Sequence, residues 1–179
     1  MSDERPGWHR HPNGGGWVQD TASVDETAHI GPDAQVCGTA QVCGTARVFG
    51  TAWVSGNAEV SGTAWVFGTA WVSGAARVSG SAWVSGNARV SGAARVSGAA
   101  WVSFPRHALT VGPIGSEDQT LTLFRTETGY GVSVGCWHPD GATLDDLTAE
   151  VQRRAPDHAD EYEAAMALCR VRIAEWEKR

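Results

Sequence analysis

The sequence has no long apolar run, and this absence excludes a membrane-spanning helix. No segment approaches the ~20 consecutive apolar residues that such a helix requires. The chain begins Met-Ser-Asp-Glu-Arg-Pro, which lacks the apolar core of a secretory signal. We therefore expect a cytoplasmic protein that does not contact a membrane.

Cysteine is scarce, and its spacing does not indicate a metal site. Cys37, Cys43, Cys136 and Cys169 form no CxxC pair and have no histidine-rich neighbourhood, which argues against zinc. Cys37 and Cys43 stand at equivalent repeat positions where serine is the common residue, so we interpret both as replacements of serine. The sequence predicts no metal, no cofactor and no disulfide.

Basic residues are too few for a general nucleic-acid-binding protein. The net charge is −6, from 14 Lys and Arg against 20 Asp and Glu, whereas nucleic-acid binding favours a strongly basic face. Residues 104–179 hold thirteen acidic and eight basic residues, while residues 18–103 hold five and four. The nearly neutral first part is suited to a surface that touches a partner.

The dominant feature of the chain is a six-residue repeat. Valine or isoleucine recurs at every sixth position from Val18 to Val102, fifteen times in all. Fourteen alanines, from Ala22 to Ala100, recur with the same period. This period fits neither a helix of 3.6 residues per turn nor a single hairpin. It is typical of a solenoid, in which each short strand stacks on the equivalent strand of the next coil.

The repeat unit Val-x-Gly-x-Ala-x predicts which residues point inward. Because side chains alternate along a strand, Val and Ala fill the interior, and Gly supplies the corner. Over residues 18–103 the pattern resembles the hexapeptide repeat of left-handed parallel β-helices. The resemblance implies three hexads per triangular coil and five coils in all. With strands ~4.8 Å apart, the prism is roughly 20–25 Å long.

Triangular coils sort the outward residues into three ladders whose members are eighteen residues apart. The first ladder contains Trp17, Gln35, Trp53, Trp71 and Arg89. The second contains Ser23, Gln41, Glu59, Arg77 and Arg95. The third contains His29, Arg47, Trp65, Trp83 and Trp101, flanked by Gly31, Phe49, Phe67, Ser85 and Ser103. Six of the nine tryptophans therefore belong to two ladders, and none belongs to the second.

The third ladder predicts a contiguous apolar surface, the aromatic patch, made of Phe49, Trp65, Phe67, Trp83 and Trp101. Patches of this kind mark interfaces, so we predict a homo-oligomer, a dimer or a trimer, that uses this patch together with Trp53 and Trp71. Burial against the C-terminal part of the same chain is a second possibility. A third is that the rings only stack and stiffen the solenoid, at ~0.5–1.5 kcal/mol per pair.

Arginines suggest a further, separate site. Arg77 and Arg95 fall on adjacent coils, Arg89 lies around a corner and Arg106 follows the last coil. Aligned charge can simply protect the solenoid from strand addition. The planar fork of arginine also suits a phosphate or carboxylate, so these four residues are candidate ligands for a small phosphorylated molecule.

The segments outside the repeat predict an arm, a linker and a small second module. Residues 1–16, rich in Gly and Pro, are expected to form a flexible arm before the β-helix of residues 17–103. Residues 104–119 are expected to be a linker. Residues 120–179 predict a ββαα module: strands at 120–125 and 131–137, a helix at about 144–155 and another from about 159, with an apolar seam that packs inside the module or pairs with another chain.

The module carries a second resemblance. Val111-Gly-Pro-Ile-Gly-Ser116, Leu123-Phe-Arg125, Val134-Gly-Cys-Trp137 and Gly141-Ala-Thr-Leu-Asp145 resemble a tail segment of uncharacterised phage and prophage proteins. This resemblance implies a phage-type accessory protein that works in the host cytoplasm. It would bind a host protein, with inhibition of a host defence system as one outcome, or would self-assemble.

Two other functions have some support in the sequence. Tryptophans beside the arginines could stack a base and hold its phosphates, as a sponge for a nucleotide signal would. Many left-handed β-helices are acyltransferases with a histidine base beside a protruding loop. Here the period never slips and His29 is the only repeat histidine, so we predict no catalytic residue. Cys136 and His138 lack a third orienting residue.

Overall fold

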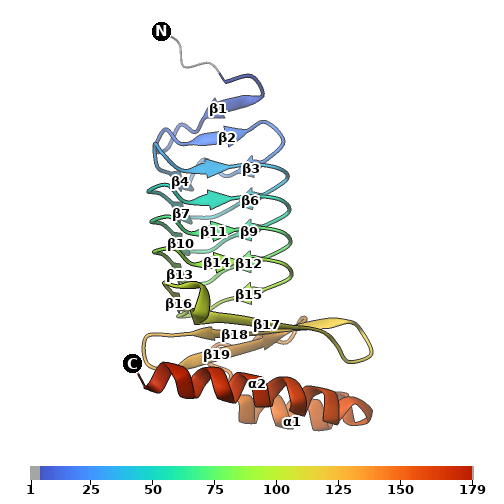
Figure 1. Cartoon of the computed structure of the whole chain (residues 1–179). Coiled ribbons are helices and arrows are strands. Elements are labelled where there is room, and N and C mark those ends of the chain that lie inside the picture. The colour runs from blue at the N-terminus through green and yellow to red at the C-terminus, as the bar shows by residue number, and fades with distance from the viewer. Residues whose placement is uncertain (1–4, 179) are drawn as a thin grey trace.

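Three sheets of parallel strands, one of them extended by a single antiparallel strand, make up the larger part of the molecule (Figure 1). The computed structural model describes residues 5–178. Each coil contributes one short strand to each sheet, and residues eighteen positions apart pair in register, as Trp65 does with Trp83. The structure therefore confirms a parallel β-helix of about five coils, and the three predicted ladders are its three sheets.

The strands of the solenoid are two or three residues long. Sheet 1 contains β1 (Trp8–Arg10), β2 (Trp17–Gln19), β5 (Gln35–Val36), β8 (Trp53–Val54), β11 (Trp71–Val72) and β14 (Arg89–Val90). Sheet 2 contains β3 (Ser23–Val24), β6 (Gln41–Val42), β9 (Glu59–Val60), β12 (Arg77–Val78) and β15 (Arg95–Val96). Sheet 3 contains β4 (His29–Ile30), β7 (Arg47–Val48), β10 (Trp65–Val66), β13 (Trp83–Val84) and β16 (Trp101–Val102).

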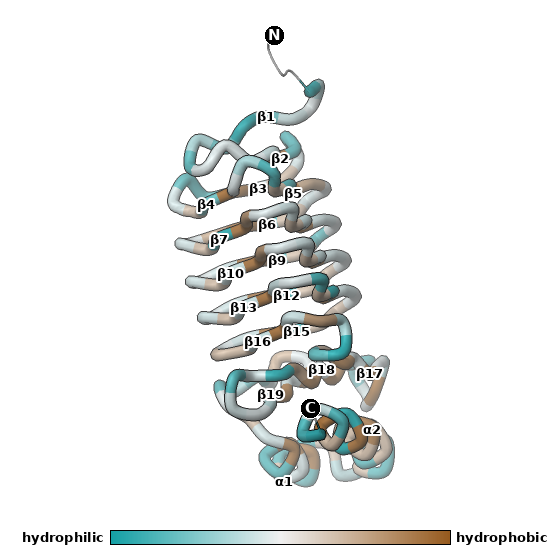
Figure 2. Tube along the Cα trace, turned by 60° about the vertical axis from the view of Figure 1, so that its left-hand side comes forward, coloured by the Kyte–Doolittle hydropathy of each residue, from teal (hydrophilic) through white to brown (hydrophobic). Residues whose placement is uncertain are grey.

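The interior of the solenoid is filled by valine and alanine alone over most of its length. Val48, Val66 and Val84, which stack along sheet 3, have no exposed surface. Figure 2 shows the hydrophobic segments recurring at the same place in successive coils. Backbone N–H groups bond to the coil that follows: the Trp65 N–H lies 2.8 Å from the Ala82 carbonyl oxygen. Apolar side chains and backbone bonds together hold the coils at one spacing.

The corner glycines adopt the conformation that their positions predict. Every repeat glycine from Gly38 to Gly98 has a positive φ, between +57° and +73°, a region that L-residues with a side chain rarely enter. Corners of successive coils also lie against one another. A Cβ atom on Gly74 would sit 3.0 Å from the backbone nitrogen of Gly92 in the next coil. Both the turn and the close stacking therefore require glycine.

The segment before the repeat is more ordered than the sequence predicts. In place of a flexible arm, β1 pairs antiparallel with β2, and the guanidinium of Arg10 lies 3.9 Å from the ring centre of Trp17. Gly16 donates its N–H to the Ile30 carbonyl, at 2.8 Å, and so covers the start of sheet 3. The cause is the unpaired edge of the first coil, which these backbone groups satisfy. Residues 1–4 of the predicted arm lie outside the described residues.

The segment predicted as a linker, 104–119, instead contains a 3₁₀ turn (Pro105–His107) and the strand β17 (Ala108–Ile114). β17 pairs antiparallel with β18 (Gln119–Arg125), which pairs with β19 (Tyr130–Val134). The module is therefore βββαα and begins at the solenoid. The sequence does not predict the first strand, because Gly112-Pro113 interrupts the alternation of apolar and polar residues after only four residues.

Two helices complete the module as predicted. α1 (Leu144–Arg154) begins at a capping box formed by Thr143 and Asp146. A 3₁₀ turn (Pro156–His158) leads into α2 (Ala159–Glu177). The seam of α2 packs into the core of its own module: Tyr162, Met166 and Cys169 are buried there, and Ile173 and Trp176 are partly buried.

The C-terminal sheet lies between the last coil and the helices (Figure 1). Its solenoid side is polar where it meets backbone: the buried Thr122 hydroxyl accepts a hydrogen bond from the Arg95 N–H, and the buried Ser133 hydroxyl donates one to the Arg95 carbonyl, both at 3.0 Å. Phe124 closes the end of the Val/Ala core. The module thus caps the solenoid. Among the described residues, no helix is both long and apolar enough to cross a membrane.

Two glycines of one corner column give a matched test of coil stacking. We expect Gly92→Ala to lower the free energy of unfolding by about 1–2 kcal/mol, the cost of a positive φ with a side chain, since a Cβ there meets no atom within 4 Å. Gly74→Ala meets the same conformational cost and also the backbone of Gly92, so its loss is larger. Urea denaturation measures both, and equal losses would contradict close stacking of the corners.

Candidate interaction surface

The aromatic patch is continuous along the outer side of sheet 3. The rings of Trp65 and Trp83 stack with centroids 5.1 Å apart and an interplanar angle of 6°. Phe49 and Phe67 stack in the same way at 4.9 Å and 4°. Edge-to-face contacts join these two columns, with Phe67 and Trp83 at 5.9 Å. Trp101 extends the patch to the last coil, 6.1 Å from Trp83.

The stacking within the patch follows directly from the register of the solenoid. Parallel strands about 4.8 Å apart place equivalent side chains at the separation that offset rings prefer. The rings stack along the coils, as one interpretation of the ladder predicted. The outer faces of the rings nevertheless remain accessible, because Trp83 and Trp101 are each 41% exposed. Stacking alone therefore leaves the patch facing solvent.

The tryptophans of sheet 1 form a separate and smaller feature. Trp53 and Trp71 meet edge to face at 5.2 Å. The indole N–H of Trp53 donates to the Cys37 sulfur at 3.0 Å, and the Arg89 guanidinium lies 5.6 Å from the ring centre of Trp71. Because this pair stands on another side of the prism, the structure does not join it to the aromatic patch.

The predicted arginine ligands are distributed over three places. Arg77 and Arg95 pair in register on sheet 2, and Arg77 also forms a 3.3 Å ion pair with Glu59. Arg89 belongs to sheet 1, and Arg106 lies in the 3₁₀ turn after the last coil. Within one chain the four guanidinium groups therefore do not face a common point.

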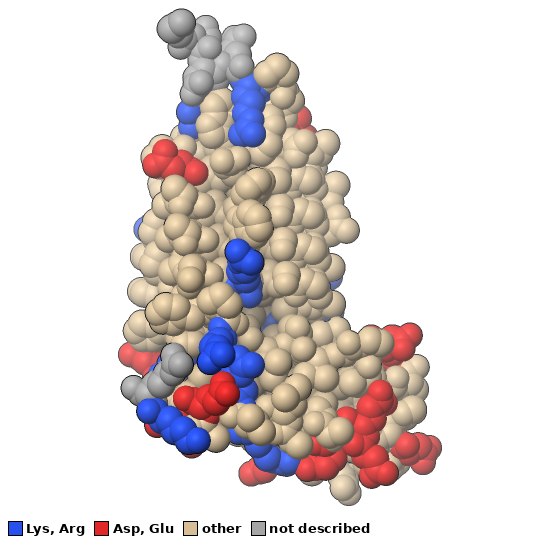
Figure 3. All heavy atoms as spheres, in the orientation of Figure 1, with Lys and Arg blue, Asp and Glu red and all other residues tan. Residues whose placement is uncertain are grey.

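A groove opens where the aromatic patch ends at the C-terminal module. Its cavity of about 670 Å³ is lined by Phe104, Pro105, Arg106, His107, Arg125, Glu175, Trp176 and Lys178. The neighbouring cavity, which His107 and Arg125 also line, includes Trp101 of the patch. No local pattern in the sequence predicts this groove, because its walls come from the turn after the last coil, β18 and the end of α2. Figure 3 shows several basic side chains, with acidic ones among them, near this junction, and a larger group of acidic side chains at the far side of the C-terminal module.

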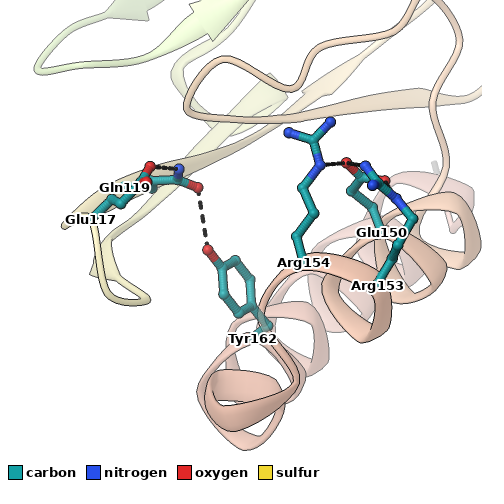
Figure 4. Close-up of polar contacts among 6 residues, drawn as sticks. All are labelled: Glu117, Gln119, Glu150, Arg153, Arg154 and Tyr162. Carbon is teal, nitrogen blue, oxygen red and sulfur yellow. Dashed lines mark hydrogen bonds and ion pairs between the residues drawn. The ribbon is translucent and has the colours of Figure 1, made fainter.

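A second cavity, of about 210 Å³, lies between the C-terminal sheet and the helices. Figure 4 shows that its polar groups are occupied with one another. The Tyr162 hydroxyl donates to Gln119 at 3.2 Å, and Glu150 pairs with Arg153 at 2.8 Å and with Arg154. Burial, followed by the nearby carboxylates of Glu161 and Glu117, raises the pKa of Tyr162. The cavity is smaller than a typical ligand site.

His29 lies in the solenoid, whereas Cys136 and His138 lie in the C-terminal module. The His29 Nδ1 atom lies 3.2 Å from the Asn13 side-chain oxygen, beneath the segment that covers the first coil. Cys136 and His138 follow the end of β19 and do not share a strand. Within residues 5–178, no three His, Cys, Asp or Glu side chains gather as metal ligands.

Comparison with known proteins supports the repeat. A model of the YdcK beta solenoid repeat family matches residues 82–98. No curated protein and no solved structure matches the chain. The matched stretch is slightly shorter than one eighteen-residue coil, so it supports a β-solenoid repeat protein and carries no activity with it.

The four cysteines differ enough in environment to be separated by their reactivity. Burial raises the pKa of the Cys169 thiol to about 11, whereas Cys136 is exposed. Because the thiolate is the reactive form, we expect a disulfide reagent at pH 8 to modify Cys136 first and Cys169 only as the chain unfolds. Cys136→Ser should remove the fast phase in a spectrophotometric thiol assay. Rapid modification of Cys169 would contradict the packing of α2.

Proposed function

We propose that this protein is a non-catalytic binding protein whose rigid β-solenoid pairs with a second copy of the chain through the aromatic patch. The observation that supports this proposal is a continuous aromatic surface on an otherwise nearly uncharged sheet, with Trp83 and Trp101 exposed and the other three rings half-buried. In sheet 3 the outward column contains no carboxylate, and Arg47 is its one permanently charged side chain. Such a surface has the composition of an interface centre, where charge is depleted and aromatic residues are enriched.

The order of side chains along sheet 3 is self-complementary. Two copies can be related by a two-fold axis that runs along the strand of Trp65. Their sheets then face each other, and the order of coils in one copy is the reverse of that in the other. Arg47 of one copy then stands opposite Trp83 of the other, which suits a cation–π contact. In the flanking column Phe49 stands opposite the small Ser85. The only tryptophan that meets its own copy is Trp65, at the axis. Arg47 already lies 5.1 Å from the ring centre of Trp65 within one chain, so it is poised at the same surface.

The size of the face predicts the strength of the pair. Five coils extend roughly 24 Å, and six residues of each coil about 20 Å. Two such faces bury on the order of 1,000 Å² in total, near the lower bound for a specific interface. We therefore expect a dimer that dissociates on dilution. The capped ends of the solenoid favour this lateral pairing over end-to-end addition of strands.

The phage-type resemblance adds a host polypeptide as the other occupant of the patch. We place the second copy first because the charge pattern and the order of side chains match the face to itself. Pairing of two copies and binding of a host polypeptide are both compatible with the cytoplasm of a host cell. If the wild-type chain stays monomeric and its patch binds a host polypeptide, self-pairing is overturned. The host polypeptide is then the partner of the patch.

A charge at the axis tests the pairing directly. Trp65→Glu places two carboxylates opposite each other in the proposed dimer, so we expect monomers at concentrations where the wild-type chain is dimeric. Analytical ultracentrifugation over a dilution series measures this change. Trp71→Glu is the matched control, because it makes the same substitution in the equivalent ladder of sheet 1 and should leave the dimer intact.

The comparison is interpreted only for variants with an unchanged circular dichroism spectrum. Equal association of the Trp65→Glu and wild-type chains would exclude the aromatic patch as the interface. A monomer produced by Trp71→Glu alone would move the interface to sheet 1. A wild-type chain that remains monomeric up to about 1 mM, the weak limit of specific association, would overturn the dimer itself.

A further inference from the structure

The groove beside the aromatic patch combines three cationic side chains with aromatic walls. Arg106 comes from the 3₁₀ turn, Arg125 from the end of β18 and Lys178 from the end of α2. All three line the cavity of about 670 Å³, which falls within the usual range for a small-molecule site. Residues far apart in the sequence therefore concentrate positive charge in one concave place on an acidic protein.

The acidic side chains among residues 5–178 do not neutralise these cations. None of the ion pairs there includes Arg106, Arg125 or Lys178, and the nearest polar contact of the Arg125 side chain is the His107 Nε2 atom, at 3.4 Å. The one carboxylate that lines the groove, Glu175, pairs with Arg172 at 3.6 Å. Most other exposed arginines of the module do have acidic partners, as Arg170 has Glu163 at 2.6 Å. Charge balance thus leaves the groove available to an anion from outside.

The walls of the groove are rings whose positions are set by contacts. The Phe104 ring meets the His107 imidazole at 5.2 Å, and His107 meets Trp176 at 6.4 Å, both edge to face. The Trp176 indole N–H donates to the Arg106 carbonyl at 2.9 Å, and the Ser103 N–H donates to His107 Nδ1 at 3.2 Å. Phe104 is nevertheless 56% exposed. An apolar ring is thus held open to solvent beside the cations.

We propose that this groove binds a small aromatic anion, a planar ring joined to a phosphate or a carboxylate. The ring packs against Phe104 and Trp176, and the acidic group pairs with Arg125, assisted by Arg106 and Lys178. Arginine suits this role because its planar fork binds two oxygens of one acidic group. Stacking of a ring on such walls adds to the affinity without requiring a particular ring.

The groove shares one residue with the arginine site that the repeat suggested. Of the four arginines singled out from the sequence, only Arg106 lies here, and Arg125 takes the central place. Arg125 also lines the two neighbouring cavities, whose acidic lining residues are Glu127 and Glu177. The site is built within one chain, so it does not depend on pairing through the aromatic patch.

Binding of adenosine 5′-monophosphate to the full chain tests the proposal, with indole-3-acetate as the carboxylate counterpart. We expect isothermal titration calorimetry to detect at least one of them, and expect adenosine and inorganic phosphate alone to bind at least about tenfold more weakly, since each supplies half of the recognition. In NMR spectra the Trp176 indole N–H signal, assigned with Trp176→Phe, should shift with the bound ligand.

Two variants and a matched control locate the site. Arg125→Gln and Phe104→Ala should each weaken binding about tenfold or more; Phe104 is exposed, so its loss does not threaten the fold. Arg89→Gln removes another arginine beside a tryptophan, on sheet 1, and should bind as the wild type does. Absence of binding by both anions up to about 10 mM, unchanged affinity in Arg125→Gln and Phe104→Ala, or loss in Arg89→Gln would overturn the proposal.

Discussion

The register between successive coils is the constraint on which the rest of this structure depends. Backbone N–H groups of one coil bond to carbonyls of the next, while an interior of valine and alanine leaves room for neither a larger nor a smaller coil. Eighteen residues therefore separate every stacked pair. Each outward side chain therefore lies beside the residues eighteen positions before and after it in the chain. Ladders of rings or charges form where the repeat places like residues at this spacing.

Closure of both ends follows from the same backbone chemistry. In the last coil, the backbone N–H of Arg95 donates a hydrogen bond to the Thr122 hydroxyl, and the Arg95 carbonyl accepts one from the Ser133 hydroxyl, both in the C-terminal sheet. At the other end, residues before the repeat bond to Ile30. A solenoid with open ends would invite strand addition. Capping leaves the lateral faces open to solvent, and the aromatic ladders lie on two of these faces.

The molecule thereby separates two kinds of surface that adjoin near Trp101, which lines the cavity next to the groove. The aromatic patch is flat, regular and nearly uncharged, which suits contact with another flat face. The groove beside it is concave, cationic and built from unlike elements, which suits a small acidic molecule. A larger group of acidic side chains lies at the far side of the C-terminal module. The C-terminal module therefore caps the solenoid. Together with the turn after the last coil, it also supplies the walls of the groove.

The amino-acid sequence by itself determined the coil, the three ladders, the aromatic patch and α1 with its capping box, because each depends on spacing within a few residues or on a strict period. Only the tertiary structure decided that residues 8–10 and β17 are strands, since both are ordered by the open edges beside them. It also decided the groove, where Trp176 bonds to Arg106, seventy positions away in the chain. No local pattern encodes that contact, because it exists only once the module has docked on the last coil.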